Sequence, residues 1–119
     1  KRTGQYRMYE EMGIYQLLFS IKDDSMLKRI IEEQIGILQV YDQENISNLL
    51  TTLDVYLQED CNITNTTQRL YVHRNTLVYR LERLEKIIGL DIRKFDDAMT
   101  FKIAMMVLDH MHYQGHTKA

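Results

Sequence analysis

Apolar residues recur at helical spacing in three stretches of this chain. In the last of these stretches they fall at i, i+4, i+7 and i+11, which places them along one side of a helix. The three stripes are Leu27, Ile30, Ile31, Ile35 and Leu38; Ile46, Leu49, Leu50, Leu53 and Leu57; and Leu77, Leu81, Leu84 and Ile88. Each stripe predicts an amphipathic helix that packs against a common core.

Polar residues and glycines mark the ends of these helices. Asp23, Asp24 and Ser25 form a turn that can cap the first stripe, and the polar run 41–45 forms the next connection, with Asn45 as a cap. Asn62 and Asp96 are further N-cap candidates, and Gly89 is placed to end a helix. The expected helices cover about 13–21, 26–38, 46–59, 63–70, 74–88 and 97–111. The pattern therefore predicts an all-α fold, a small helical domain with a long apolar C-terminal helix.

The last of these helices is apolar on almost every side. Its apolar members are Phe101, Ile103, Ala104, Met105, Met106, Val107, Leu108 and Met111. Such a helix is buried on more than one side. We expect the N-terminal segments and a second copy of the chain to share in covering it, and Gly115 to break the helix.

Composition supports one small helical domain. The chain has 119 residues, no proline and five glycines, so few residues interrupt helices. The single Cys61 cannot form an internal disulfide, which favours a cytoplasmic protein, and no apolar run is long enough to span a membrane. Lys1 stands where an initiator Met would be, which suggests a fragment of a longer protein. We expect a linker over 1–12, a helical lead-in over 13–44, a main domain over 45–112 and a tail over 113–119.

The net charge of −2 conceals an uneven distribution. Residues 1–61 hold six Lys/Arg against eleven Asp/Glu, whereas residues 62–94 hold seven against three. Positive charge is therefore concentrated in one segment, as attraction to nucleic-acid phosphates requires. A solvated charged face would give the same count.

Residues 71–84, YVHRNTLVYRLERL, have the layout of a DNA-recognition helix. A short polar helix, NITNTTQRL, precedes them, and a turn joins the two. The leucine stripe faces inward, so Arg, Asn, Thr and Tyr side chains near the helix start face outward. These side chains are suited to base edges and phosphates. The pair therefore predicts a helix-turn-helix.

Residues 49–90, LLTTLDVYLQEDCNITNTTQRLYVHRNTLVYRLERLEKIIGL, resemble the C-terminal helix-turn-helix domain of the PucR/CdaR family of bacterial transcriptional regulators. The segments YEEMGIYQLLFSI and VYD resemble the lead-in to that domain, and the helical pair is similar to the Fis-type helix-turn-helix. The resemblance implies a DNA-binding output domain that acts on an operator, with the effector bound by domains upstream. Thr67 departs from the pattern, which has a small Ala where the two helices cross, and its hydroxyl needs a partner such as the carbonyl one turn back.

The start of the predicted recognition helix carries the candidate base-reading residues. Arg74 can form two hydrogen bonds with guanine, unless it is a surface residue beside Glu85. Asn75 can pair with adenine or satisfy backbone N–H groups at the helix start. His73 is a helix cap or a phosphate contact, with capping preferred, and Thr76 suits a phosphate or a thymine methyl group.

The remaining candidates are phosphate contacts. Tyr79 faces outward and needs a polar partner for its hydroxyl, and Arg80 and Arg83 are expected to hold the DNA backbone. Thr64 and Asn65 could offer backbone N–H groups to a phosphate at the start of the preceding helix, although simple solvent exposure explains them equally well. The expected partner is a palindromic DNA operator bound by a homodimer.

Other functions have weaker support in the sequence. His110, His112 and His116 could suggest a metal site, but they do not share one helix face and lack further ligands, so we expect no metal or cofactor. No nucleophile–base pair or phosphate-binding glycine loop points to an enzyme. The main alternative is a helical assembly module, in which the last helix and the first segments dimerise a regulator and DNA contact is secondary.

Overall fold

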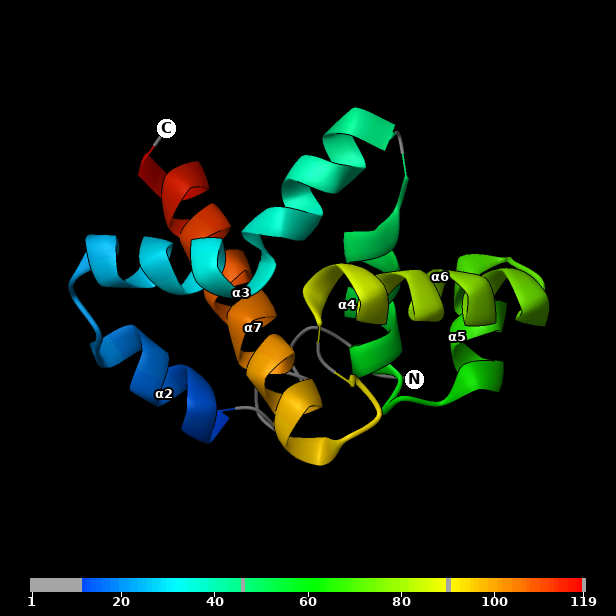
Figure 1. Cartoon of the computed structure of the whole chain (residues 1–119). Coiled ribbons are helices and arrows are strands. Elements are labelled where there is room, and N and C mark those ends of the chain that lie inside the picture. The colour runs from blue at the N-terminus through cyan, green and yellow to red at the C-terminus, as the bar shows by residue number, and fades with distance from the viewer. Residues whose placement is uncertain (1–11, 46, 90, 119) are drawn as a thin grey trace.

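A computed structural model describes residues 12–45, 47–89 and 91–118, with side chains omitted at positions 12, 19 and 113–118. Within these ranges the secondary structure is helical, which confirms the predicted all-α fold (Figure 1). The helices are α2 (Met12–Ser20), α3 (Asp24–Asn45), α4 (Leu49–Gln58), α5 (Ile63–Leu70), α6 (Arg74–Ile88) and α7 (Phe95–Lys118). No helix in the described ranges has the length and apolarity needed to cross a membrane.

Helix α7 forms the centre of the core. Phe101, Ala104 and Val107 are at most 1% exposed. Helices α3 and α4 pack against α7, and Figure 1 shows α3 crossing it. The chain's own helices therefore bury much of this apolar helix. The predicted end near Met111 is wrong, because α7 continues through Gly115 to Lys118. Its first turn contains Asp96, which we expected to precede the helix.

Helix α3 is longer than predicted, and the connection expected over 41–45 is wrong because these residues form its last turns. The cap of α4 also differs from expectation. The Asp42 carboxylate accepts hydrogen bonds from the backbone N–H groups of Leu49 and Leu50, at 3.0 and 2.9 Å. The Asn45 side chain instead donates to the Tyr41 carbonyl within its own helix. A residue of α3 thus accepts hydrogen bonds from the N–H groups at the start of α4, and these bonds link the two helices.

The helix-turn-helix pair has the predicted bounds. The Asn62 side chain accepts a hydrogen bond from the Asn65 N–H at 2.8 Å, which confirms it as the cap of α5. Gly89 ends α6 in the left-handed conformation, with a φ of 74°. Tyr71 takes the left-handed conformation at the end of α5, with a φ of 57°.

The expected division into linker, lead-in, DNA-binding domain and tail remains an interpretation. Of the proposed linker only Met12 lies inside the described ranges, where it begins α2. The lead-in and the DNA-binding part share one core: Leu18 of α2 and Leu27 of α3 belong to the same buried cluster as Leu77 of α6.

Candidate nucleic-acid interface

The first turn of α6 stands in solvent. His73, Arg74, Asn75 and Thr76 are all exposed, while Leu77, one position further, is fully buried. Leu81 and Leu84 continue the buried stripe. Because this stripe fixes the inner side of α6, its polar leading end is presented outward.

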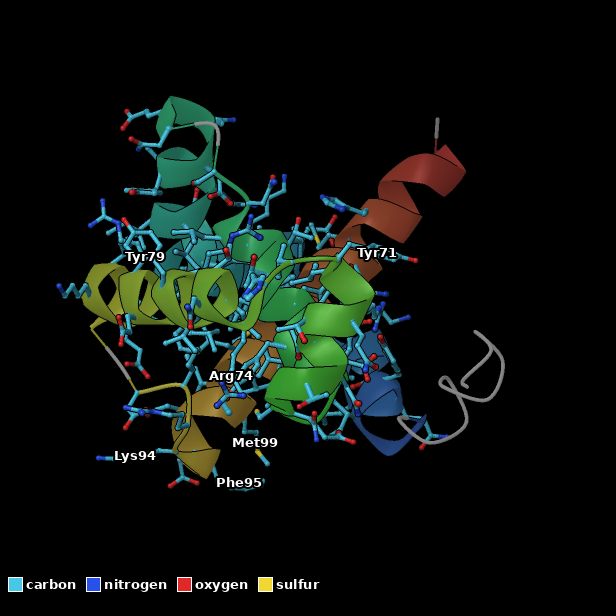
Figure 2. The ribbon with its side chains drawn as sticks, turned by 90° about the vertical axis from the view of Figure 1, so that its right-hand side faces the viewer. Tyr71, Arg74, Tyr79, Lys94, Phe95 and Met99 are labelled. Carbon is cyan, nitrogen blue, oxygen red and sulfur yellow. The ribbon has the colours of Figure 1, made fainter. Side chains whose placement is uncertain are left out.

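Arg74 makes no hydrogen bond or ion pair with any residue in the described part of the chain. Its proposed surface partner, Glu85, lies instead 3.4 Å from the Arg93 guanidinium. Figure 2 shows Arg74 and Tyr79 leaving α6 on opposite sides of the helix in that view. The Arg74 guanidinium is therefore available to a ligand.

His73 occupies the N-cap position of α6, but its side chain forms no capping hydrogen bond. His73 is thus the cap residue of α6, as we preferred, but its side chain takes no part in the cap. Its backbone carbonyl accepts from the Leu77 N–H at 3.1 Å, as that of any N-cap residue does. The imidazole of His73 is exposed beside Arg74.

Arg80 lies half-buried on the side of α6 that faces α4. Its guanidinium donates to the hydroxyl of Thr52 at 3.3 Å, and that hydroxyl in turn donates to the Asn48 carbonyl at 2.7 Å. Thr52 is fully buried, so Arg80 is partly anchored to the protein. An anchored arginine can contact a phosphate only with its remaining N–H groups.

Arg83 is exposed and contacts α3. Its Nη2 donates to the Tyr41 hydroxyl at 2.8 Å, and its Cζ lies 5.6 Å from the centre of the Tyr41 ring. The hydrogen bond to Tyr41 raises the pKa of Arg83 above its ordinary value. The guanidinium thus remains charged, and one of its donors is in use.

Two exposed tyrosines flank the leading end of α6. Tyr79 is 62% exposed, as its helical position predicts, and Tyr71 in the turn before α6 is 94% exposed. Figure 2 shows Tyr71 projecting beyond α5. The sequence reasoning missed Tyr71, because nothing in its neighbours distinguishes an exposed turn tyrosine from a buried one.

The start of α5 offers less to a phosphate than expected. The Asn65 N–H is already bonded to the Asn62 side chain, so that donor is occupied and this part of the prediction is wrong. The side chains of Thr64 and Asn65 are exposed. The Thr67 hydroxyl donates to the Thr64 carbonyl at 2.7 Å, one turn back as expected. The fully buried threonine of α5 is its neighbour, Thr66.

Residues 62–94 form the basic segment of the chain, and acidic residues pair with some of its arginines. Arg69 pairs with Glu59 at 2.9 Å, and Arg93 lies 3.2 Å from Asp91. Burial is the main cause that raises the pKa of Glu85, whereas the pKa of Asp91 is lowered, chiefly by the N–H of Arg93. The basic residues of this segment outside these ion pairs are Arg74, Arg80, Arg83, Lys86 and Lys94, four of them on α6.

The histidines of α7 form no metal site within the described side chains. No cluster of three or more potential ligands occurs there. His110 is buried and His112 is exposed, so the two face different surroundings, as their spacing predicts. The side chain of His116 lies outside the described residues.

Comparison with known proteins agrees with this arrangement. The model of the PucR C-terminal helix-turn-helix domain matches residues 49–107, which run from α4 into α7. The chain is 34% identical over 105 residues to the purine catabolism regulatory protein of Bacillus subtilis, covering 88% of this chain and 19% of that protein. It is 27% identical over 100 residues to the proline-responsive transcriptional activator PutR of the same organism, covering 84% of this chain and 24% of that protein.

A third relative is the carbohydrate diacid regulator of Escherichia coli, 27% identical over 99 residues, with 83% of this chain and 25% of that protein covered. This chain thus spans only about a fifth to a quarter of the length of these relatives. No solved structure matches it significantly. On the family match and these regulators together, the chain belongs to the family of PucR C-terminal helix-turn-helix domains.

Proposed function

We propose that this chain is the sequence-specific DNA-binding output domain of a transcriptional regulator, with α6 entering the major groove. The observation that carries the proposal is the exposed polar start of α6 above a buried leucine stripe. A helix of this kind fits the width of the major groove of B-form DNA, and its first residues contact base edges.

Helical position suggests a division of roles along α6. Asn75 points away from the leucine stripe and is exposed, and its amide can pair with adenine. Arg74 has no competing partner in the described chain and is our choice for guanine, where two hydrogen bonds give about 1–3 kcal/mol of discrimination. Thr76 suits a phosphate or a thymine methyl group.

The proposed phosphate contacts surround the base-contacting residues at the start of α6. Tyr79 and Arg83 project from α6, Arg80 contributes the donors that Thr52 leaves unused, and His73 stands at the helix start. Thr64 and Asn65 on α5 contribute exposed side chains. Contacts of this class position the protein on the duplex without reading its sequence.

We further propose that the domain binds a palindromic operator as a homodimer, with the two copies of α6 about 34 Å apart. Support comes from α3, on which Met26, Ile37 and Val40 are about half exposed and can be covered by a second copy. A longer regulator would bind its effector in another domain. Sedimentation of the chain alone and with DNA tests the oligomeric state.

A titration with three single-site variants tests the proposal. Duplexes enriched from a random library by the parent chain would be titrated by fluorescence anisotropy with the parent, Arg74→Ala, Asn75→Ala and Lys28→Ala. We expect Arg74→Ala and Asn75→Ala each to weaken binding to the enriched duplex about 5- to 100-fold. Lys28→Ala removes the same charge as Arg74→Ala from the distant half of α3 and should have little effect. Equal losses in Arg74→Ala and Lys28→Ala would contradict the assigned face.

A further inference from the structure

Helix α3 reaches the proposed DNA-binding face through Tyr41. This tyrosine lies 42 positions before Arg83 in the chain, yet its hydroxyl accepts a hydrogen bond from the Arg83 guanidinium at 2.8 Å. The same guanidinium lies 5.6 Å from the centre of the tyrosine ring. Two contacts therefore orient a side chain that is otherwise surrounded by solvent.

The partner of Arg83 is a phenol and not a carboxylate. A carboxylate would neutralise the guanidinium and compete with a phosphate for it, whereas a neutral hydroxyl leaves the full positive charge available. Asp42, the residue next to Tyr41, is directed elsewhere. Its carboxylate accepts from the Ser47 hydroxyl at 2.5 Å and from two backbone N–H groups at the start of α4.

Tyr41 and Arg83 together retain unused donors. The guanidinium has five N–H groups, of which the Tyr41 hydroxyl takes one. Because that hydroxyl acts as acceptor toward Arg83, its own hydrogen is left to donate to another oxygen. Tyr79 lies one turn before Arg83 on α6 and is 62% exposed. Figure 2 shows Tyr79 on the side of α6 nearest to α3.

We infer that Tyr41, Tyr79 and Arg83 form a phosphate-binding clamp across α3 and α6, in which Tyr41 positions Arg83 and donates its own hydroxyl to the DNA backbone. The inference rests on the proposed DNA-binding function and extends the interface to a helix outside the helix-turn-helix. Because Tyr41 already orients Arg83 in the free protein, the arginine loses less side-chain entropy when DNA binds. More of its interaction energy with phosphate then contributes to affinity.

A double-mutant cycle with Tyr41→Phe and Arg83→Ala tests the clamp. Tyr41→Phe removes the hydroxyl and keeps the ring, so the core contacts of α3 are preserved and the melting temperature should stay near that of the parent. The probe is a mixed-sequence duplex of about 30 base pairs, titrated over a salt series, because phosphate contacts do not depend on sequence. Alongside these variants, Arg74→Ala is titrated on the enriched duplex.

We expect Tyr41→Phe to weaken binding about three- to tenfold, and to cause little further loss in the Arg83→Ala background. Arg83→Ala should lower the slope of log affinity against log salt by about 1. If Tyr41→Phe binds as well as or more tightly than the parent while Arg74→Ala loses affinity, the clamp is wrong and the proposed function stands. If the folded parent binds neither duplex at low salt, the proposed function itself fails.

Discussion

Tyr71 holds the left-handed backbone conformation that joins the two helices of the helix-turn-helix, with a φ of 57°. This conformation costs an L-residue other than glycine roughly 1–2 kcal/mol. The residue is 94% exposed, so its ring recovers little of that cost through burial. At this position, next to the start of α6, the ring can either contact DNA on the proposed function or support the fold.

Tyr71→Gly separates these two roles. Removing the strain should raise the free energy of unfolding by about 1 kcal/mol, because glycine adopts positive φ without a steric penalty. The same variant should bind DNA more weakly, since the phenol is lost. Urea unfolding and the anisotropy titration measure the two effects. A less stable variant with unchanged DNA affinity would show that the ring supports the fold.

The sequence predicted the exposed residues of the site better than their partners. The leucine stripe placed Asn75, Thr76 and Tyr79 away from the core, and Arg74 was placed at the helix start, because helical spacing and helix ends are local properties. The contacts of Arg80 with Thr52 and of Arg83 with Tyr41 join residues far apart in the chain. Local pattern carries no information on such pairs, so both arginines were predicted only as phosphate contacts.

At the scale of elements, the error over 41–45 has a specific cause. The polar sequence YDQEN resembles a loop, and Asn45 is a common capping residue. In the structure the run stays helical and Asp42 reaches three donors at the start of the next helix. Tertiary contacts of this kind override the local preference for a turn.

Asp42→Ala tests whether this carboxylate joins α3 to α4. Two backbone N–H groups and the Ser47 hydroxyl would lose their acceptor, so the free energy of unfolding should fall by about 1–2 kcal/mol. Glu44→Ala removes an exposed carboxylate from the same end of α3 and serves as the control, with an expected change within about 0.5 kcal/mol. Equal effects in chemical denaturation would contradict the capping role.

Replacing two of the glycines by alanine should change the stability of the chain in opposite directions. Gly36 lies within α3, and an added Cβ would come no closer than 3.9 Å to Glu32. Gly36→Ala should therefore stabilise the chain by about 0.5–1 kcal/mol. Gly89 has a positive φ at the end of α6, and Gly89→Ala should destabilise by about 1 kcal/mol.

Thermal unfolding of both glycine variants measures these shifts. A loss of stability in Gly36→Ala would show that α3 depends on the glycine at this position. The course of α3 matters for the proposed function because its C-terminal half carries Tyr41.

At the scale of the whole molecule, one core supports both the lead-in and the helix-turn-helix. Helix α7 packs on α3 and α4, and α3 in turn packs on α6. The apolar periodicity predicted a helix buried on several sides, and we expected the N-terminal segments and a second copy to cover it. Within the described chain, α3 and also α4 pack against it. Its length was also underestimated, because Gly115 was taken as a break while the helix continues to Lys118.

This packing places α3 against α6, the helix of the proposed binding face. A displacement of α3 relative to α6 would alter the Tyr41–Arg83 contact and, on the proposed function, the affinity for DNA. The Tyr41–Arg83 contact joins α3 directly to the proposed binding face.

The most direct test of the central claim is a nuclear magnetic resonance titration of the chain, labelled with nitrogen-15, with its enriched duplex. We predict that the largest amide shifts occur over residues 73–83 and at Tyr41, while the N-terminal half of α3 changes little. Shifts confined to α2 and the exposed apolar residues of α3, with residues 73–83 unaffected, would contradict the account.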